Sequence, residues 1–349
     1  MMTNVLYCIA SSAAAAVIIR LMISNAERLG LVQPPVARSS HKRPTPTGGG
    51  VGIVVGAVFG CLAFAGSDPV ALGLCGLGVV IAVLGLIDDR TPLPARVRLL
   101  VQAGAVVGAI LLADIAPSLF GAAYGMLWPL AAVLLLLAGI WWINLFNFMD
   151  GIDGIAGQQA ALMLFSAMVI TWGSESSSFL PFWWMMAAVL LSTLAFVAFN
   201  WPPARIFMGD AGSTFLAFVL FGFALISISA GEMTVVQWLL LASLFATDAT
   251  VTLLVRFFRR EKVTQAHRSH AYQRLSRRMD GALPVTAGAA FVNLALILPI
   301  AFCLPASPFA AYSILVAVYA AVGIGCLWLG AGLRDDETGG HFRFFGVRD

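Results

Sequence analysis

The sequence has little charge and few cysteines. Only 11% of its 349 residues are charged, whereas 60% are hydrophobic, and this balance excludes a water-soluble globular protein. The five cysteines lie singly in apolar runs, with neither CxxC spacing nor nearby histidines. This pattern excludes a disulfide framework and a zinc site, so we predict that the cysteines are small packing residues.

Long apolar runs dominate the chain. As helices, runs of about 18 or more residues can cross a hydrocarbon core about 30 Å thick. We therefore predict an all-α polytopic integral membrane protein in which residues 1–349 form a single integral-membrane domain. The eleven expected spans are Thr3–Ile23, Gly49–Ala65, Val70–Ile87, Leu99–Ala113, Gly125–Phe146, Gln158–Trp172, Phe179–Phe199, Ser213–Ala230, Val235–Val255, Pro284–Cys303 and Phe309–Gly332.

Positive charge lies on one side of these predicted spans. If the first loop is cytoplasmic, all twenty Lys and Arg residues fall on the inner side. The positive-inside rule then predicts an outer amino terminus and a cytoplasmic carboxyl terminus. The inner segments are longer than the outer ones and carry the polar clusters: 25–48, 88–98, 147–157, 200–212, 256–282 and the tail 333–349.

A basic turn that leads into glycines ends the first inner loop. His41 and Lys42 begin the sequence His-Lys-Arg-Pro-Thr-Pro-Thr-Gly-Gly-Gly. Its backbone N–H groups can face an anion while the cationic side chains supply charge. The alternative is a positively charged anchor with a flexible hinge, because no phosphate-loop pattern is present.

Two adjacent carboxylates open the second inner loop. Asp88 and Asp89 follow an apolar run and precede Arg90, Arg96 and Arg98. Adjacent carboxylates repel each other, so we expect one of them to recruit a cation or to have a raised pKa. The alternative is a solvated helix end neutralised by the arginines, although the helix dipole disfavours acids there.

Polar side chains recur every three residues at Asn144, Asn147, Asp150 and Asp153. At helical spacing they form one stripe, which is too costly to face lipid and must face a protein-lined, hydrated cavity. The loop itself contains no basic residue. Its acids are therefore left to pair with a metal, a donor ligand or arginines from elsewhere.

Asp210 lies between glycines at the start of a span, within Phe-Met-Gly-Asp-Ala-Gly-Ser. The glycines permit close backbone approach, and an aspartate here is a candidate Mg²⁺ ligand. Helix capping is the alternative. Phe207 is a candidate for stacking on a base, although ordinary interfacial packing is favoured for this residue taken alone.

The fifth inner loop is the most basic. His267 and His270, three apart on a predicted helix, share a face and are candidates, with Arg268, for binding metal or phosphate. Anionic lipid binding is the alternative for the arginines. Asp248 lies inside a predicted span, where an ionisable residue indicates function.

These clusters combine carboxylates, which hold Mg²⁺, with arginines and histidines, which hold phosphate oxygens. In this order they resemble the polyprenyl-phosphate N-acetylhexosamine-1-phosphate transferases, the family that includes phospho-N-acetylmuramoyl-pentapeptide transferases and lipid-linked GlcNAc-1-phosphate transferases. The outside-to-inside topology is similar to that of the GlcNAc-1-phosphate branch. The resemblance rests on segment 41–50, the Asp88-Asp89 pair, the stripe 144–154, segment 207–213, Asp248 and the histidine loop up to residue 273.

The resemblance implies transfer of a sugar 1-phosphate from a UDP-sugar to undecaprenyl phosphate, with Mg²⁺ or Mn²⁺ and release of UMP. It implies a reaction centre at Asp88 and Asp89, a metal at Asp210 and Asp88, and phosphate or sugar contacts from His267 and His270. The further residues expected to bind substrate are His41, Lys42, Arg98, Asn144, Asn147, Asp150, Asp153, Phe207 and Arg268.

The histidine loop reads His-Arg-Ser-His-Ala-Tyr-Gln, where other branches have adjacent histidines. This resembles the branch that primes O-antigen or related surface polysaccharides, at the cytoplasmic face of the bacterial inner membrane. The donor stays open among UDP-linked GlcNAc, GalNAc, FucNAc, QuiNAc and other hexosamines, as do a covalent intermediate and a homodimer. Membrane lipid is an expected partner and nucleic acid is not.

A transporter or lipid flippase with a cytoplasm-facing acidic site is the competing class. Transporters place buried acids near the bilayer midplane, often in repeated halves. Here nearly all acids lie at one predicted interface, and no internal repeat is visible. The distribution favours an enzyme that works where a soluble donor meets a membrane acceptor.

The predicted topology determines which loops a membrane-impermeant thiol reagent reaches. Cysteines placed in the inner loops are expected to react only in inside-out vesicles, and bound UDP-sugar is expected to shield those near Asp150 and Asp210. The measurement is the labelling yield in paired vesicle preparations. Labelling of the same positions in intact cells would contradict both the topology and the cytoplasmic site.

Overall fold

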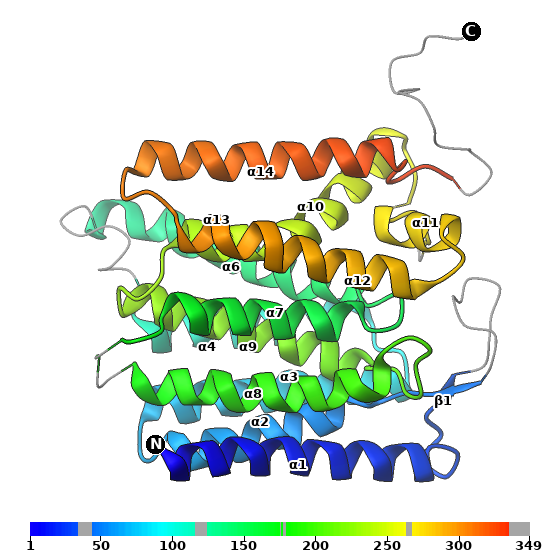
Figure 1. The fold of residues 1–349 in the computed structure, drawn as a ribbon, viewed down its shortest axis with the longest axis horizontal. Coiled ribbons are helices and arrows are strands. Elements are labelled where there is room, and N and C mark those ends of the chain that lie inside the picture. The colour runs from blue at the N-terminus through cyan, green and yellow to red at the C-terminus, as the bar shows by residue number, and fades with distance from the viewer. Residues whose placement is uncertain (34–43, 116–123, 175, 177–178, 263–266, 335–349) are drawn as a thin grey trace, which may run out of the picture.

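The computed structural model describes residues 1–33, 44–115, 124–174, 176, 179–262 and 267–334. Its long helices run side by side along one axis (Figure 1). The helices are α1 (Met2–Asn25), α2 (Gly50–Phe64), α3 (Pro69–Arg90), α4 (Ala95–Ala113), α6 (Tyr124–Phe148), α7 (Ile155–Ile170), α8 (Leu180–Asn200), α9 (Asp210–Ser229), α10 (Val235–Phe258), α11 (Ala271–Arg278), α12 (Ala282–Val292), α13 (Leu298–Phe302) and α14 (Pro308–Trp328).

The predicted all-α class is confirmed. In the described part of the chain, the strands are β1 (Val32–Gln33) and β2 (Thr45–Pro46), which form one short antiparallel pair. Between α12 and α13 the chain continues as a π-helical turn, Asn293–Ile297, so these three elements make one continuous segment. Each predicted apolar run coincides with a helix or with this segment.

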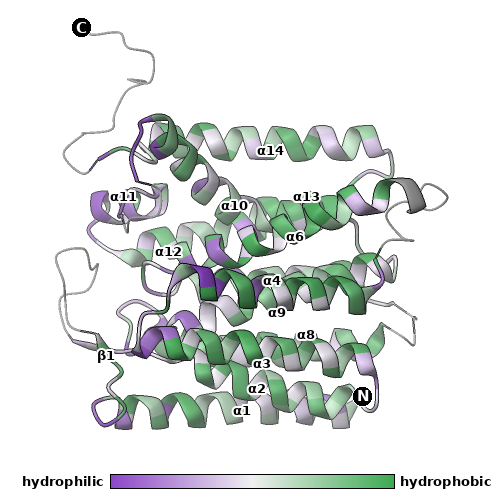
Figure 2. Cartoon of the chain, turned by 180° about the vertical axis from the view of Figure 1, so that it is seen from behind, coloured by the Kyte–Doolittle hydropathy of each residue, from purple (hydrophilic) through white to green (hydrophobic). Residues whose placement is uncertain are grey.

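The chain is a multi-pass membrane protein. Nine helical segments of the described residues are long and apolar enough to cross a membrane, whereas α2 and α7, with 15 and 16 residues, are shorter. Hydrophilic residues gather at the end of the bundle that carries β1 and α11 (Figure 2). The polar loops that the sequence assigns to one side of the membrane therefore meet at one end of the fold.

Helix α9 is the centre of the bundle. It packs against α2, α3, α4, α6 and α7, and 78% of its apolar stretch is buried inside the protein. Helix α14 packs against α10, and only 11% of its apolar stretch is buried. A helix that is apolar on all sides and enclosed by other helices has no face left for lipid, so α9 carries its first residues into the interior of the protein.

Close backbone packing holds α2 and α3 against the start of α9. A Cβ atom on Gly50 would collide with the backbone of Gly212, and one on Gly85 would lie 2.6 Å from the amide nitrogen of Ala211. These contacts involve backbone atoms, which cannot rotate away. Small residues at helix interfaces allow such close approach within membranes.

The predicted span ends differ from the observed helix ends by up to four residues, for example at the starts of α7 and α9. The span expected to begin at Ser213 begins at Asp210, and the one expected at Gln158 begins at Ile155. Hydropathy assigns polar residues to loops, but a polar residue can occupy a helix end when another element satisfies the backbone there. Asp210 is therefore the first residue of α9 and not part of the preceding loop.

The contact between Gly50 and Gly212 predicts intolerance of a methyl group. Gly50→Ala is expected to lower stability by about 1–3 kcal/mol, because overpacking against backbone outweighs the higher helix propensity of alanine. The measurement is the thermal unfolding midpoint in detergent. Gly104→Ala is the matched control, since a Cβ on Gly104 meets no atom within 4 Å; equal midpoints for the two variants would contradict the packing argument.

Candidate active site

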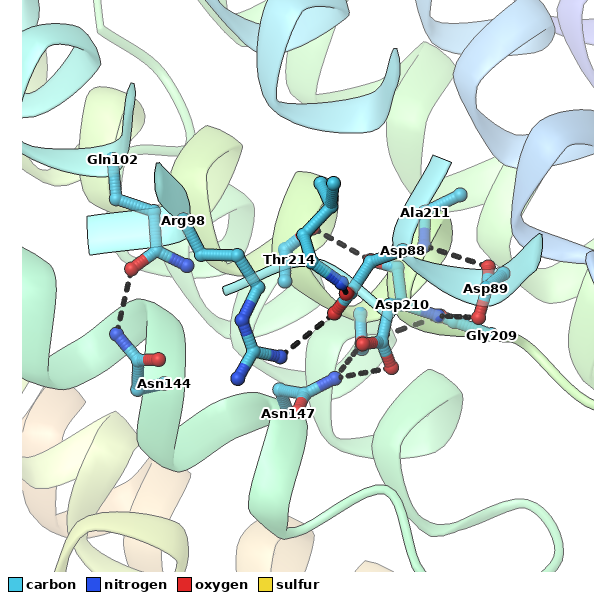
Figure 3. A network of polar contacts seen from close by, with 12 residues as sticks. Asp88, Asp89, Arg98, Gln102, Asn144, Asn147, Gly209, Asp210, Ala211 and Thr214 are labelled. Carbon is cyan, nitrogen blue, oxygen red and sulfur yellow. Dashed lines mark hydrogen bonds and ion pairs between the residues drawn. The ribbon is translucent and has the colours of Figure 1, made fainter. Parts of the chain in front are cut away.

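Asp89, near the end of α3, caps the start of α9. Its Oδ1 accepts the N–H of Asp210 at 2.8 Å, and its Oδ2 accepts the N–H of Ala211 at 3.2 Å (Figure 3). The N-cap position of α9 is Gly209, which has no side chain to do this and a φ of 77° that favours glycine. Both oxygens of Asp89 are thus used to position the helix that begins with Asp210.

Asp88 points to different partners from those of its neighbour. Its Oδ2 accepts from Nη1 of Arg98 at 2.7 Å, and its Oδ1 accepts from the N–H of Leu93. The Asp88 side chain is 9% exposed and that of Arg98 is 39% exposed. The acidic pair therefore does not act as one unit: an arginine neutralises Asp88, and a helix N-terminus neutralises Asp89.

Asn147 connects α6 to the first turn of α9. Its Nδ2 donates to Oδ1 of Asp210 and to Oγ of Ser213, both at 2.9 Å. The carboxyl group of Asp210 also contacts that of Asp88. Asp88 and Asp210, which the sequence separates by more than a hundred residues, lie together with Asn147 in the structure (Figure 3).

A small cavity of about 20 Å³ lies beside these groups, with space for about one water or ion. One helical turn before Asn147, Asn144 also lines this cavity, and its Nδ2 donates to Oε1 of Gln102 at 2.8 Å. Its polar lining comes from α3, α4, α6 and α9: Asp88, Arg98, Gln102, Asn144, Asn147, Asp210 and Thr214.

The predicted four-residue helical stripe is wrong beyond Asn147. Helix α6 ends at Phe148, so Asp150 and Asp153 lie in the turn between α6 and α7. The N–H of Asp150 closes a tight turn on the carbonyl of Asn147, and Gly154 has a φ of 79°. Glycines in this turn allow a chain reversal that a period of three or four residues cannot reveal.

Asp153 positions the loop that precedes α9. Its Oδ2 accepts the N–H of Ala204 at 2.9 Å. Asn200, at the end of α8, completes the connection by accepting from the N–H of Gly154 and donating to the carbonyl of Ile206. Our sequence analysis missed Asn200; its signal was a buried amide at the end of an apolar run, directly before Trp-Pro-Pro.

Asp150 is the acid of this turn with the most capacity to bind a ligand. Among the described residues no donor forms a hydrogen bond with its carboxylate, and other acids lie close to it. Burial, together with the charges of Asp210, Asp89 and Asp153, raises the pKa of Asp150 to about 7. The charged form of such a carboxylate is unfavourable unless a proton or a cation neutralises it.

The glycine-rich segment docks onto the loop before α9. The N–H of Phe207 donates to the carbonyl of Pro46 at 2.8 Å, and the N–H groups of Gly49 and Gly50 donate to the carbonyls of Phe207 and Met208. Those two glycine N–H groups are therefore not free for an anion, contrary to expectation. His41 and Lys42 lie outside the described residues. The Phe207 side chain is half-buried.

Asp248 caps α11 in the way that Asp89 caps α9. Its two oxygens accept the N–H groups of Ala271 and Tyr272, both at 2.9 Å. The hydroxyl of Tyr272 donates to the carbonyl of Phe148 at 3.0 Å, at the end of α6. This chain of contacts joins the basic loop to the turn that carries Asp150.

The histidines do not share a helix face. Helix α11 begins after them at Ala271, and their rings stack with centroids 5.0 Å apart. His270 is buried, with Nδ1 3.4 Å from Oδ1 of Asp248, whereas His267 is half-buried. Burial lowers the pKa of His267 to about 3, helped by His270 and Arg256, so His267 is neutral near pH 7. Arg268 is half-buried, and its carbonyl accepts from Arg277.

Comparison with known proteins agrees with the predicted resemblance. Residues 71–228 match the family described as glycosyl transferase family 4. This region contains the carboxylates and amides around Asp210, whereas Asp248 and the histidine loop lie beyond it.

Bacterial proteins of related sequence have names of the same kind. The probable undecaprenyl-phosphate N-acetylglucosaminyl 1-phosphate transferase of Bacillus subtilis (strain 168) is 28% identical over 259 residues, 71% of this chain and 70% of the relative. The undecaprenyl-phosphate alpha-N-acetylglucosaminyl 1-phosphate transferases of Escherichia coli (strain K12) and Yersinia pestis are 29% and 31% identical. Those two matches cover 56% and 55% of this chain, and 54% of each relative. The resemblance is confirmed.

The raised pKa of Asp150 predicts a pH-dependent stability. Between an unfolded pKa near 4 and a folded pKa of about 7, the folded state binds more protons, so stability falls as pH rises. Asp150→Asn stays neutral and should gain a few degrees in Tm over the native chain, the gain growing from about pH 5 to about pH 8. Thermal unfolding in metal-free buffer is the measurement.

Asp280→Asn is the control for this substitution. Asp280 is exposed and has a φ of 56°, a conformation that asparagine also adopts. The Tm of this variant should differ from that of the native chain by less than the Tm of Asp150→Asn does at pH 8. If the Tm difference between Asp150→Asn and the native chain did not change with pH, the turn would not disfavour the charged carboxylate.

Proposed function

From the match of residues 71–228 to glycosyl transferase family 4, we propose that the protein transfers an N-acetylhexosamine 1-phosphate from a UDP-sugar to undecaprenyl phosphate. The products are undecaprenyl-diphosphate-sugar and UMP. One observation carries the proposal: Asp88 and Asp210 converge with Arg98 and Asn147 at a single cavity. Transfer between two phosphates needs such carboxylates, for a cation, beside a guanidinium for phosphate oxygens.

The donor set of Asp88 and Asp210 fits Mg²⁺. Within the described ranges no group of three His, Cys, Asp or Glu side chains is placed to hold a metal ion, so we assign two protein carboxylates to the ion. Mg²⁺ is commonly held by one or two carboxylates together with water and substrate phosphates. Contact between two carboxyl groups is repulsive unless a proton or cation lies between them. The ion supplies charge neutralisation for the meeting of two anionic substrates.

The acids of this site have separate roles in the proposal. Asp89 is a positioning residue, because α9 uses both of its oxygens. Asp88 is the candidate base or orienting group for the acceptor phosphate, whose second pKa is near 6. The attacking acceptor oxygen forms a bond to the phosphorus that carries the sugar, and the bond from that phosphorus to the UMP oxygen breaks.

Arg98 is the candidate contact for the acceptor phosphate. Its guanidinium is 39% exposed and already lies 2.7 Å from Asp88. Guanidinium groups bind phosphate oxygens in pairs, so an arriving phosphate can replace the carboxylate as its partner. This exchange would release Asp88 for a proton or a cation when the acceptor is present.

The donor occupies the side of the site formed by the 150–154 turn and the histidine loop. His267 is neutral and half-buried, so it offers one N–H group to a phosphate or sugar oxygen. His270 is enclosed by Asp248 and the His267 ring, and it supports His267 without reaching the ligand itself. Asp150 and Phe207 complete the donor side of the proposed site.

The membrane location follows from the acceptor. Each CH₂ of a polyprenyl tail costs about 0.8 kcal/mol to expose to water, so the phosphate must come to the protein while the tail stays in lipid. The site lies at the hydrophilic end of the bundle (Figure 2). We place it at the cytoplasmic face of the bacterial inner membrane, where the product primes O-antigen or another surface polysaccharide. A transporter explains this one-sided position poorly.

The direct test measures UMP release with undecaprenyl phosphate and a panel of UDP-N-acetylhexosamines. Activity should require Mg²⁺ or Mn²⁺. Asp210→Asn and Asp88→Asn should each lower the rate by at least about 10²-fold through lost charge stabilisation and proton transfer. His267→Ala should chiefly weaken donor use.

Asp280→Asn serves as the matched control and should keep the native rate, because this exposed carboxylate lies outside the site. Folded yield and elution volume are measured for every variant. Full activity in excess EDTA would refute the metal, and the absence of UMP release with every donor would refute the proposed transfer.

A further inference from the structure

Two arginines from distant segments contact one aromatic ring at the flank of the bundle. The Cζ atom of Arg20, on α1, lies 5.9 Å from the ring centroid of Phe199, on α8. The Cζ atom of Arg205 lies 5.4 Å from the same centroid. The backbone N–H of Arg205 donates to the carbonyl of Phe199. Helices α1 and α8 pack side by side (Figure 1).

These two cations have no acidic partner among the described residues. Other arginines of the same end do: Arg98 pairs with Asp88, and Arg256 pairs with Glu261. The C-terminal dipole of α8 is a partner for Arg205. Arg20 lies more than one turn before the end of α1, so no helix dipole accounts for it. The Phe199 ring lies within cation–π distance of both guanidinium groups, so two positive charges gather at one ring.

An exposed apolar strip on α1 leads to this pair. Val17 and Leu21 are 54% and 52% exposed, and they share a helix face with Arg20. Trp201, the residue directly after α8, is 38% exposed, and tryptophan is typical of the level of lipid headgroups. An apolar strip that ends in two cations is complementary to an amphiphile with a phosphate head.

We propose that Arg20, Arg205 and Phe199 form a binding site for the phosphate headgroup of a membrane lipid. The site is built from residues other than those around Asp210. Each guanidinium can donate two N–H groups to phosphate oxygens, and an anion neutralises the positive charge that gathers at this ring. The lipid tail lies along Val17 and Leu21. Free phosphate has no tail to make these apolar contacts.

The test counts lipids retained by the purified full-length protein in native mass spectrometry. The probes are dioleoylphosphatidylglycerol, undecaprenyl phosphate, inorganic phosphate, and dioleoylglycerol, which has the same tails as the first but no phosphate. The double variant Arg20→Ala/Arg205→Ala should lose at least about tenfold in lipid-phosphate affinity, equivalent to one charge-assisted hydrogen bond. Dioleoylglycerol should bind the two proteins equally.

Arg28→Ala/Arg96→Ala is the matched control, because it removes the same charge from two exposed arginines of the same end. It should retain lipid like the native protein. Phe199→Leu keeps an apolar side chain but removes the ring, and it should weaken retention even if the double variant folds poorly. The readout is binding, so it is independent of UMP release.

The outcomes separate the sources of the phosphate. Weaker retention of phosphatidylglycerol by the double variant supports a phospholipid site. Weaker retention of undecaprenyl phosphate alone supports a site for the acceptor. Competition by inorganic phosphate at equal concentration would overturn the lipid assignment. Equal retention by the native protein, the double variant and Phe199→Leu would overturn the site.

Discussion

Both oxygens of Asp89 accept the backbone N–H groups that begin α9, and the rest of the site depends on this contact. The first N–H groups of a helix have no partner within it, and leaving them unpaired inside a membrane protein is costly. Gly209 cannot cap α9, so α3 supplies the carboxylate, and Gly85 lets the two backbones approach. Asp88 and Asp210 thereby become neighbours.

The same requirement recurs around the site. Asp248 caps α11, and Tyr272 donates to the end of α6. Arg274 is buried and donates to carbonyls of Leu329 and Leu333, after the end of α14. Several polar residues at this end of the bundle therefore hold a helix terminus of another element in place. What remains available for substrates and a cation is a smaller set, centred on Asp88, Asp150 and Asp210.

The errors of the sequence analysis share one physical origin. Spacing of three residues predicted a helical stripe through Asp153 and a helical face with both histidines, yet α6 ends at Phe148 and α11 begins only at Ala271. Periodicity assumes that the helix continues, whereas turns at Gly154 and caps such as Asp248 decide where it begins and ends. Asn200 went unnoticed because its importance lies in two contacts between loops, which no spacing shows.

The sequence by itself determined the membrane class, the helical runs, the predicted side of the basic loops and the polar motifs that mark the site, because hydropathy and charge are sums over neighbouring residues. Only the tertiary structure decided which acid does what. In the folded protein Asp89 caps a helix terminus, Asp88 pairs with Arg98, and Asp153 accepts a backbone N–H of a loop. Asp150 lies among other carboxylates. The physical reason is that a carboxylate takes its role from the donors that reach it, and these donors come from helices far apart in the chain.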